Sequence, residues 1–215
     1  MTYKYIVFDT ETTGLPPKKT DRFYSSFDES GYPNINNINA SNQCRMVSIA
    51  WLIFEDDKTE PLISRYFVIK PHYFSIPQES SRIHKITQEY AMKNGNDIND
   101  VLKTLENDIK DIDCRVAHNF LFDKYVTSSE MYRNNHNKLL EKWNSIGSFC
   151  TMGHGMTHYN FGYNRGGYPK PPRLQELYKK ITGNEFDNAH NAVADTKATA
   201  ECYQYMIKQL PSHAY

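Results

Sequence analysis

The sequence predicts an α/β protein with a mixed sheet covered by helices, and two observations support this prediction. First, three apolar, β-branched segments typical of strands occur early in the chain. Second, helical and strand-like patterns alternate over the remainder. No internal repeat and no convincing linker interrupts this order. Residues 1–215 are therefore expected to form a single domain.

The first three strands are expected to pair in an antiparallel arrangement. Residues 5–8, Tyr-Ile-Val-Phe, contain no polar side chain, which is typical of a buried strand. Residues 46–54 form a second strand that ends at the turn-forming residues 55–58, and residues 63–69 form a third. Because the connection between the second and third strands is short, it favours a hairpin.

Between the first two strands, residues 16–44 show no periodic pattern. The segment begins with Pro16 and Pro17, contains Gly-Tyr-Pro at residues 31–33, and is rich in asparagine towards its end. Residues of these types interrupt regular structure. The segment is therefore expected to be a long surface loop or insertion and not a domain.

The remaining elements follow from their periodicity. Helices are expected at residues 78–84, 88–92, 97–110, 119–133, 174–181 and 191–210, and short strands at residues 114–118 and 146–150. Asp97 is a suitable N-cap for the helix that follows it. Residues 152–172 are rich in glycine, proline and aromatic residues, and we expect them to form a loop.

Composition limits the class of protein. Lys plus Arg equals Asp plus Glu, 25 each, so the formal net charge is zero and nucleic acid would have to bind to local basic patches. The four cysteines form no C-x-x-C pair, which argues against a zinc site or a disulfide framework. The first strand follows Met1 directly, and no apolar run approaches the roughly 18 residues of a membrane span. We therefore expect a soluble, intracellular, cytoplasmic-type protein without a signal peptide or membrane contact.

Two carboxylates follow the first strand, at Asp9 and Glu11. Side chains two positions apart in an extended chain point to the same face, so the two acids are expected to lie together. Like charges this close repel each other unless a cation lies between them, and Mg²⁺ prefers carboxylate oxygens. The alternative is a solvated turn that carries two acids. A metal site would need further carboxylates from elsewhere in the chain.

Three later residues meet this requirement. Asp123 lies just inside a helix that follows a buried strand, where ligands of open α/β sheets are found; alternatively, it stabilises the first helical turn. Asp195 lies near the start of the last helix, and a stripe of Thr199, Cys202 and Met206 would let this helix pack closely on the sheet. His190 precedes the helix and would bend back towards Asp195, although a histidine at a helix start is more often a surface residue.

Together these segments resemble the DEDDh exonucleases, the DnaQ-like family of 3′–5′ exonucleases. The matching motifs are Asp9-Thr-Glu11-Thr-Thr-Gly, Ala-His-Asn119-Phe-Leu-Phe-Asp123 and His190-Asn-Ala-Val-Ala-Asp195. Residues 82–87 and 173–177 agree as well, so the resemblance covers nearly the whole chain apart from residues 16–44. Each motif alone is weak, whereas three in order at compatible spacings are specific.

The resemblance implies a ribonuclease H-like fold, with a five-stranded mixed sheet flanked by helices, and a metal-dependent nuclease. The acids would hold two divalent cations, Mg²⁺ or Mn²⁺, and His190 would act as general base. The enzyme would release 5′-mononucleotides from single-stranded 3′ ends, of DNA more readily than of RNA. The residues implied in substrate binding are Thr10, Thr12, Leu15, His84 and Ile86, with Asn119 supporting the second motif.

The chain departs from the family pattern in two places. Cys150 and Thr151 stand where an Asp-Thr pair is common, and the loop at residues 152–172 takes the place of a helix. Basic residues outnumber acids from 152 to 182, and tyrosines are interleaved among glycines. We therefore expect Arg165 and Lys170 to bind single-stranded nucleic acid, with aromatic rings stacking on bases. The alternative is a mobile surface loop whose tyrosines cover the core.

Other functions remain open at this point. An RNA exonuclease or oligoribonucleotide-degrading enzyme of the same family would carry the same motifs. A catalytically inactive nucleic-acid-binding module would share the fold, but it would have no reason to retain four acids and a histidine. The sequence also leaves open whether the protein acts alone, as a homo-oligomer or with a polymerase.

Overall fold

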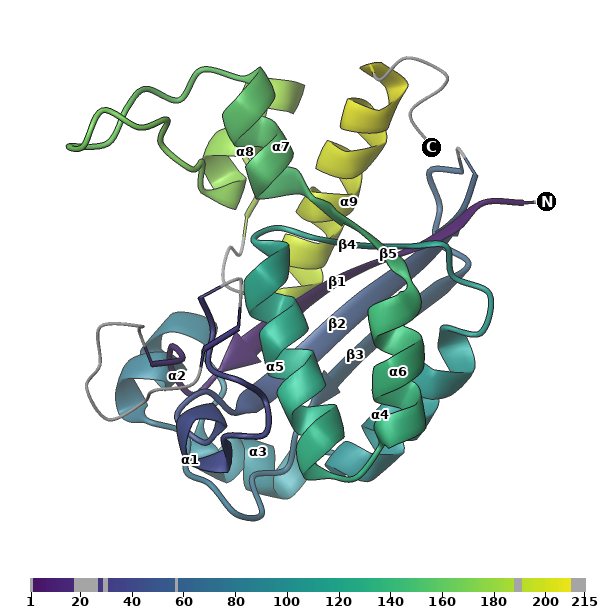
Figure 1. Cartoon of the computed structure of the whole chain (residues 1–215), viewed down its shortest axis with the longest axis vertical. Coiled ribbons are helices and arrows are strands. Elements are labelled where there is room, and N and C mark those ends of the chain that lie inside the picture. Colours follow the sequence, from purple (N-terminus) through teal and green to yellow (C-terminus); the bar gives the residue numbers. More distant parts are fainter. Residues whose placement is uncertain (1, 18–26, 29–30, 57, 188–190, 210–215) are drawn as a thin grey trace.

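A five-stranded mixed sheet forms the centre of the protein, with helices on both faces (Figure 1). The computed structural model describes residues 2–17, 27–28, 31–56, 58–187 and 191–209. The strands are β1 (Lys4–Thr12), β2 (Met46–Glu55), β3 (Ile63–Val68), β4 (Cys114–Ala117) and β5 (Gly147–Cys150). The helices are α1 (Ile38–Ser41), α2 (Gln78–His84), α3 (Gln88–Asn94), α4 (Ile98–Asp108), α5 (Phe120–Arg133), α6 (Asn137–Ser145), α7 (Thr151–His158), α8 (Leu174–Thr182) and α9 (Ala192–Gln209).

The strand order is β3-β2-β1-β4-β5. Strands β1, β2 and β3 pair in an antiparallel arrangement, whereas β4 is parallel to β1 and β5 is parallel to β4. The predicted ribonuclease H-like five-stranded mixed sheet, with its first three strands antiparallel, is therefore confirmed. The pairing of β1 with β4 covers only Tyr5 to Val7, so the last part of β1 has a strand partner on one side only.

The alternation of side chains along β1 gives the sheet two buried faces. Ile6 and Phe8 pack with residues of α4, α5 and α6 in the largest hydrophobic cluster. Tyr5 and Val7 point to the opposite face, where α9 contributes Tyr203. Because Asp9 and Glu11 continue the alternation of Tyr5 and Val7, the two acids lie on the face that α9 covers.

Helix α9 packs on the sheet, as predicted, and also on helix α8. Ala200 and Tyr203 contact the sheet residues of β1, β2 and β4. The predicted stripe is fully buried, but Cys202 and Met206 pack against Leu177 and Ile181 of α8. The expectation for this stripe was therefore incomplete, because α8 lies along α9 and forms a second interface with Cys202 and Met206.

Residues 152–172 do not form one continuous loop, which corrects the prediction. Thr151–His158 is helix α7, and its first turn is capped by the Cys150 Sγ atom, which accepts a hydrogen bond from the Gly153 amide at 3.3 Å. A Cβ atom on Gly155 would lie 2.9 Å from Leu177 Cδ1. The glycine therefore permits close packing of α7 on α8 and does not mark a loop. Helix α6, for which the sequence analysis made no prediction, covers the sheet beside α5.

The predicted insertion at 16–44 contains ordered structure in its described part. Helix α1 ends the segment, a β-bridge joins Phe27 to Pro33, and the Tyr32 ring stacks on Tyr125 of α5 at 5.3 Å between centroids. The prediction of a loop there was incomplete, because short helices give little periodicity. All four cysteines are free thiols. Over the described residues, no helix is both long and apolar enough to cross a membrane.

Candidate active site

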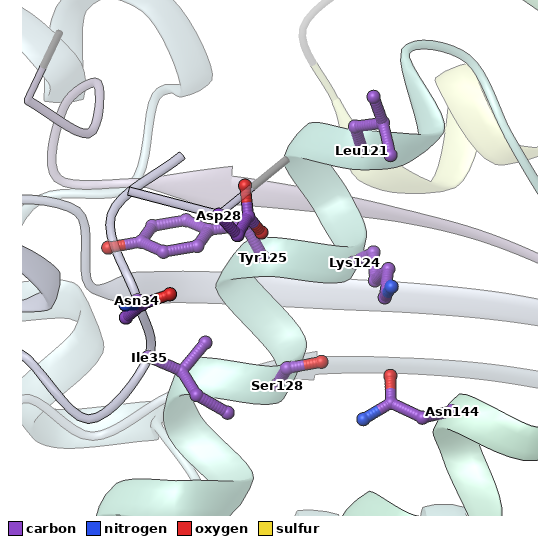
Figure 2. Close-up of a pocket in the computed structure, with 8 residues that line it drawn as sticks. All are labelled: Asp28, Asn34, Ile35, Leu121, Lys124, Tyr125, Ser128 and Asn144. Atoms are coloured by element: carbon purple, nitrogen blue, oxygen red, sulfur yellow. The ribbon is translucent and has the colours of Figure 1, made fainter. Parts of the chain in front are cut away.

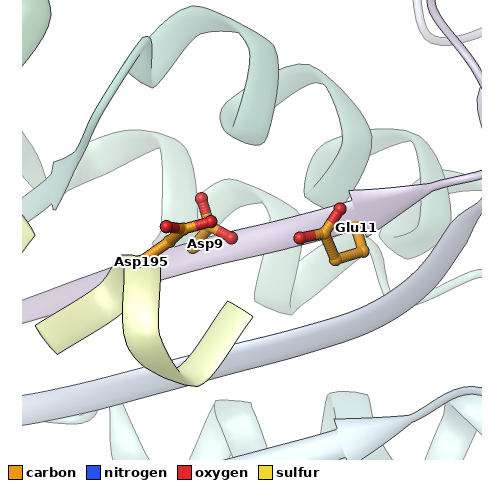
Figure 3. A group of neighbouring side chains, drawn as sticks. All are labelled: Asp9, Glu11 and Asp195. Atoms are coloured by element: carbon orange, nitrogen blue, oxygen red, sulfur yellow. The ribbon is translucent and has the colours of Figure 1, made fainter. Parts of the chain in front are cut away.

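Three acids from two elements meet where β1 approaches the start of α9. The carboxylates of Asp9, Glu11 and Asp195 each offer an oxygen, and these oxygens all lie within 4.8 Å of one another (Figure 3). Asp9 and Glu11 share one face of β1, and Asp195 belongs to the first turn of α9. The structure thus brings together three of the four predicted acids.

The fourth acid, Asp123, is connected to this cluster through Thr10. Asp123 lies in the first turn of α5 and is 2% exposed. Its Oδ1 atom accepts hydrogen bonds from the Thr10 amide at 3.0 Å and from the Thr10 hydroxyl at 2.7 Å. The amide is available because β4 no longer pairs with β1 at this point. The Asp123 side chain therefore accepts the hydrogen bond that a neighbouring strand would otherwise take from the Thr10 amide.

The carboxylates raise one another's affinity for protons. Burial is the main cause that raises the pKa of Asp9 well above its usual range, and the charges of Asp123, Asp195 and Glu11 add to it. Burial, followed by the charges of Asp195 and Asp123, raises the pKa of Glu11 to about 8. The pKa of Asp123 rises to about 7, because burial outweighs the hydrogen bonds from Thr10.

This donor set fits hard divalent cations. Carboxylate oxygens are the ligands that Mg²⁺ and Mn²⁺ prefer, and a cation would relieve the repulsion that holds protons on these acids. Of the described residues, only Asp9, Glu11 and Asp195 form a group of three or more potential metal ligands. Asp123 would add a fourth carboxylate through the oxygen that Thr10 does not use.

The predicted general base, His190, lies outside the described residues. The chain is described again from Asn191, whose Oδ1 atom accepts hydrogen bonds from the amides of Val193 at 3.0 Å and Ala194 at 3.4 Å. This cap begins α9 one turn before Asp195. The role of His190 therefore remains a prediction.

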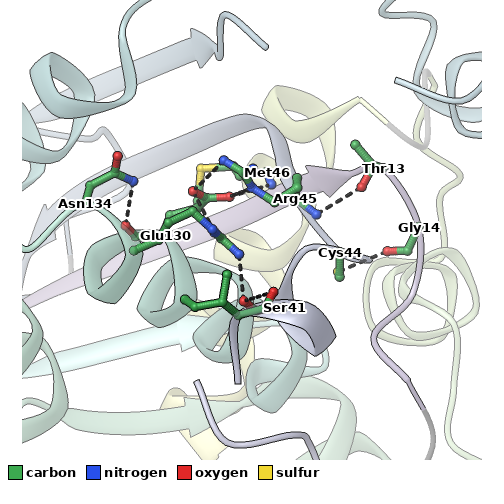
Figure 4. A network of polar contacts seen from close by, with 10 residues as sticks. Thr13, Gly14, Ser41, Cys44, Arg45, Met46, Glu130 and Asn134 are labelled. Carbon is green, nitrogen blue, oxygen red and sulfur yellow. Dashed lines mark hydrogen bonds and ion pairs between the residues drawn. The ribbon is translucent and has the colours of Figure 1, made fainter. Parts of the chain in front are cut away.

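The backbone after the two acids of β1 is fixed by a network that the sequence analysis did not identify (Figure 4). The Thr13 amide donates to the Arg45 carbonyl, and the Arg45 amide donates to the Thr13 hydroxyl, both at 2.9 Å. The Arg45 side chain forms a buried ion pair with Glu130 of α5 at 2.8 Å. Residues 12–14 are thereby connected to the same helix that carries Asp123. No local sequence pattern distinguishes these two charged residues from surface charges.

The residues implied in binding the terminal nucleotide differ in exposure. Leu15 is 73% exposed, whereas His84 and Ile86 are buried. The Ile86 amide donates to His84 Nδ1 at 3.1 Å. Burial lowers the pKa of His84. The Thr12 hydroxyl donates to the Gly14 carbonyl at 2.8 Å.

Asn119 lies at the N-cap of α5 in a left-handed conformation, with φ of 64°. Its side chain makes no capping hydrogen bond to the helix and instead interacts with the Tyr32 phenol of the insertion. The residue thus stands between Tyr32 and the turn that leads to Asp123. Whether it supports the second motif, as the resemblance implies, stays a prediction.

His118 connects three segments and was also missed by the sequence analysis. Its Nδ1 atom lies 3.0 Å from the Thr151 hydroxyl at the start of α7, and its Nε2 atom lies 3.0 Å from the Pro172 carbonyl. Burial lowers the pKa of His118 to about 4, so the ring is neutral. A neutral ring can donate from Nε2 and accept at Nδ1. The residue therefore fixes both ends of the segment that contains residues 159–170.

Residues 159–170 form a hairpin that extends from α7 and α8 at one end of the molecule (Figure 1). A bridge joins Tyr163 to Pro169, and Asn164 Oδ1 accepts hydrogen bonds from the amides of Gly166 and Tyr168. Tyr163 and Tyr168 are each 72% exposed. By contrast, Tyr159 and Phe161 pack against the cluster formed by α8 and α9.

The two basic residues predicted on this segment differ in their partners. Lys170 Nζ forms an ion pair with Glu176 at 2.6 Å. Arg165 is exposed, and in the described part of the chain it has no ion-pair partner. Only Arg165 therefore offers its full charge to an incoming phosphate.

A separate cavity of about 210 Å³ lies between α5 and the insertion (Figure 2). Its lining includes Leu121, Lys124 and Ser128 of α5, at positions three to four residues apart along one face of the helix. Asp123 belongs to a different face of α5. This cavity is therefore not part of the acid cluster.

Comparisons with known proteins concern the family of the chain and its fold. The model of the RNase_T family, described as exonuclease, matches residues 6–203 of the chain. No curated protein matches the chain in sequence. Exonuclease I from E. coli in complex with a dA16 oligonucleotide superimposes with a TM-score of 0.71 and 20% identity, over 97% of this chain and 42% of that chain.

Two further solved structures have the same fold. A product-bound exonuclease I gives a TM-score of 0.70 at 18% identity, over 97% of this chain and 44% of that chain. Exonuclease I from Methylocaldum szegediense gives 0.66 at 18% identity, over 98% and 41%. The present chain thus spans less than half the length of these exonucleases.

Proposed function

This chain belongs to the RNase_T family of exonucleases. We therefore propose that it releases 5′-mononucleotides from the 3′ ends of single-stranded nucleic acid. The proposed substrate is DNA in preference to RNA. The observation that carries this proposal is the cluster of Asp9, Glu11 and Asp195. Asp123 is linked to this cluster by its hydrogen bond from Thr10, which lies between the two acids of β1. Buried like charges are costly unless they bind cations. A role in metal-dependent hydrolysis accounts for that cost.

The four acids would hold two Mg²⁺ or Mn²⁺ ions. When bound, such ions stabilise the negative charge that develops on the phosphodiester oxygens during hydrolysis. The contribution of the chain itself is to place the acids. Strand β1 supplies Asp9 and Glu11 as one rigid unit, and Thr10 fixes the orientation of the Asp123 carboxylate.

His190 is proposed as the general base. In the reaction, the oxygen of a water molecule forms a bond to the terminal phosphorus, and the water proton passes to the neutral imidazole. The bond between phosphorus and the 3′ oxygen of the preceding nucleotide breaks, and that oxygen takes up a proton. One water is consumed, and one 5′-mononucleotide is released in each cycle.

The terminal nucleotide is proposed to lie against the turn after β1. Leu15 is exposed there and can contact a base, while Thr12 and the backbone of residues 12–14 lie next to Glu11. His84 and Ile86 would contribute to the same subsite through α2 and the residues after it. The ion pair of Arg45 with Glu130 supports this turn from behind.

The hairpin at 159–170 is proposed to hold the strand upstream of the terminal nucleotide. Tyr163 and Tyr168 expose rings on which unpaired bases can stack, and Arg165 can contact a phosphate. Lys170 already pairs with Glu176, so its proposed contribution is smaller. Stacking has little sequence preference, which suits an enzyme that degrades strands of any sequence.

A cleavage assay tests this function directly. Single-stranded DNA and RNA of one sequence, labelled at the 5′ end, should shorten stepwise from the 3′ end in Mg²⁺, and DNA should shorten faster. EDTA or Asp195→Asn should abolish the reaction. Faster cleavage of RNA would reverse the substrate preference, and an absence of metal-dependent cleavage of both strands would refute the proposal.

A further inference from the structure

Two histidines of α7 lie side by side at positions i and i+4. The ring centroids of His154 and His158 are 4.1 Å apart, with an angle of 27° between the ring planes. Residues four apart lie on the same face of a helix, so both rings project from one side of α7. This pair uses none of the residues of the acid cluster.

The surroundings hold this pair in place and leave it accessible. The Phe149 ring contacts His154 at 5.1 Å between centroids and supports it from the sheet side. His158 is exposed and lines a cavity of about 320 Å³ beneath the 159–170 hairpin. Within the described chain, neither imidazole makes a hydrogen bond or an ion pair.

We propose that His154 and His158 together bind one transition-metal ion, of the class of Zn²⁺, Ni²⁺ or Cu²⁺. Two imidazoles one helical turn apart can coordinate a single ion, as in helical zinc motifs, once each ring turns out of the observed stack and points one nitrogen at the ion. Imidazole nitrogen prefers these ions, whereas carboxylate oxygen prefers Mg²⁺ and Mn²⁺. The protein therefore has two metal sites of different selectivity, and water completes the coordination at the histidine pair.

Metal binding at this site would fix the last turn of α7. His158 is the final residue of the helix, and the hairpin begins at the next residue. An ion held by both rings resists unwinding of that turn, so it stabilises the base of the hairpin. The alternative explanation is that the two rings extend the aromatic packing of Phe149 and have no affinity for metal.

Calorimetric titration of the protein with ZnCl₂, in excess Mg²⁺, distinguishes these explanations. The Mg²⁺ occupies the carboxylates and competes poorly for imidazole. Loss of supporting groups around a metal costs 10–100-fold in affinity, so His154→Ala and His158→Ala should each weaken Zn²⁺ binding at least about tenfold. His72→Ala removes another exposed histidine and should leave the affinity unchanged.

A composition-matched variant provides the decisive control. His158→Ala combined with Met156→His keeps the number of histidines on α7 but moves one ring to another face, so it should bind as weakly as His158→Ala. Electron paramagnetic resonance of bound Cu²⁺ should show two coordinating nitrogens in the wild type and one in each single variant. Unchanged Zn²⁺ affinity in both single variants, or full affinity in the matched variant, would overturn the proposal.

Discussion

Thr10 is the residue whose role the structure changes most. The resemblance implied that it contacts the substrate, yet both its amide and its hydroxyl donate to Asp123. Thr10 is 6% exposed, so little of it is available to a nucleotide. We therefore assign Thr10 the positioning of the Asp123 carboxylate, which is proposed to bind metal.

Thr10→Val is the matching test, because valine keeps the shape of threonine and lacks its hydroxyl. Residues that support metal ligands typically contribute 10–100-fold, so kcat/KM should fall by about that factor and the Mg²⁺ concentration for half-maximal activity should rise. The hydrogen bond from the backbone amide of residue 10 to Asp123 remains, which limits the loss of activity. Thr10→Ser restores the hydroxyl and should recover most of the activity; if it is no better than Thr10→Val, the hydroxyl has no such role.

At the level of the elements, the neutral imidazole of His118 holds together β4, α7 and the segment before α8. His118 bonds to Thr151 and to the Pro172 carbonyl, and the Thr151 hydroxyl also donates to the Ala117 carbonyl at 3.5 Å. His118→Leu leaves both groups buried without this partner, and each such loss costs about 1–3 kcal/mol. The free energy of unfolding in urea should fall by that order. His72→Leu, at an exposed position, should leave it unchanged.

The hairpin differs from a simple basic loop, because among the described residues only Lys170 of its two predicted cations has an ion-pair partner. Arg165→Ala should weaken binding of single-stranded DNA and reduce the slope of log K against log salt by about 0.7, the value for one lost phosphate contact. Lys170→Ala should change the slope less, since Glu176 already neutralises Lys170. The catalytic rate at saturating DNA should stay the same. Equal slopes in wild type and Arg165→Ala would remove the hairpin from the substrate path.

The whole molecule should respond to pH through its acid cluster when metal is absent. The pKa of Glu11 rises from 4.5 in the unfolded chain to about 8 in the folded protein. A folded state with the higher pKa binds the proton more tightly, so the stability due to Glu11 is complete below pH 4.5 and is lost as the pH rises through 8.

Glu11→Gln should therefore raise Tm in EDTA at pH 8 and have no effect near pH 4.5. A gain on the order of 3 °C corresponds to about 1 kcal/mol for a chain of this size. In Mg²⁺ the order should reverse, because the wild type binds the ion more tightly. Glu141→Gln, on the exposed face of α6, serves as the control. A wild-type Tm in EDTA that does not fall between pH 4.5 and 8 would contradict this assignment.

The sequence predicted the sheet and the proximity of the acids because both depend on local patterns. The alternation along β1 placed Asp9 and Glu11 on one face, and the strand preceding α5 placed Asp123 at the end of the sheet. The family motifs then connected these residues to Asp195. Each of these inferences needed only neighbouring residues or their order along the chain.

Features that depend on contacts between distant segments could not be predicted in this way. Gly155 indicated a loop, although in the fold it allows α7 to approach Leu177. Arg45 and Glu130 are 85 residues apart, and their burial becomes evident only when β2 and α5 are in place. Likewise, the partner that neutralises Lys170 is set by the hairpin geometry.

The early end of the pairing between β1 and β4 gives the Thr10 amide an unusual acceptor. This backbone N–H donates to a carboxylate whose pKa lies at about 7, so its proton chemical shift should follow the ionisation of Asp123. In metal-free protein, the ¹⁵N–¹H resonance of Thr10 should move through a titration near neutral pH. Added Mg²⁺ should hold that resonance at its high-pH position. A single main-chain nuclear magnetic resonance signal can thus serve as an internal indicator of the charge on a buried acid.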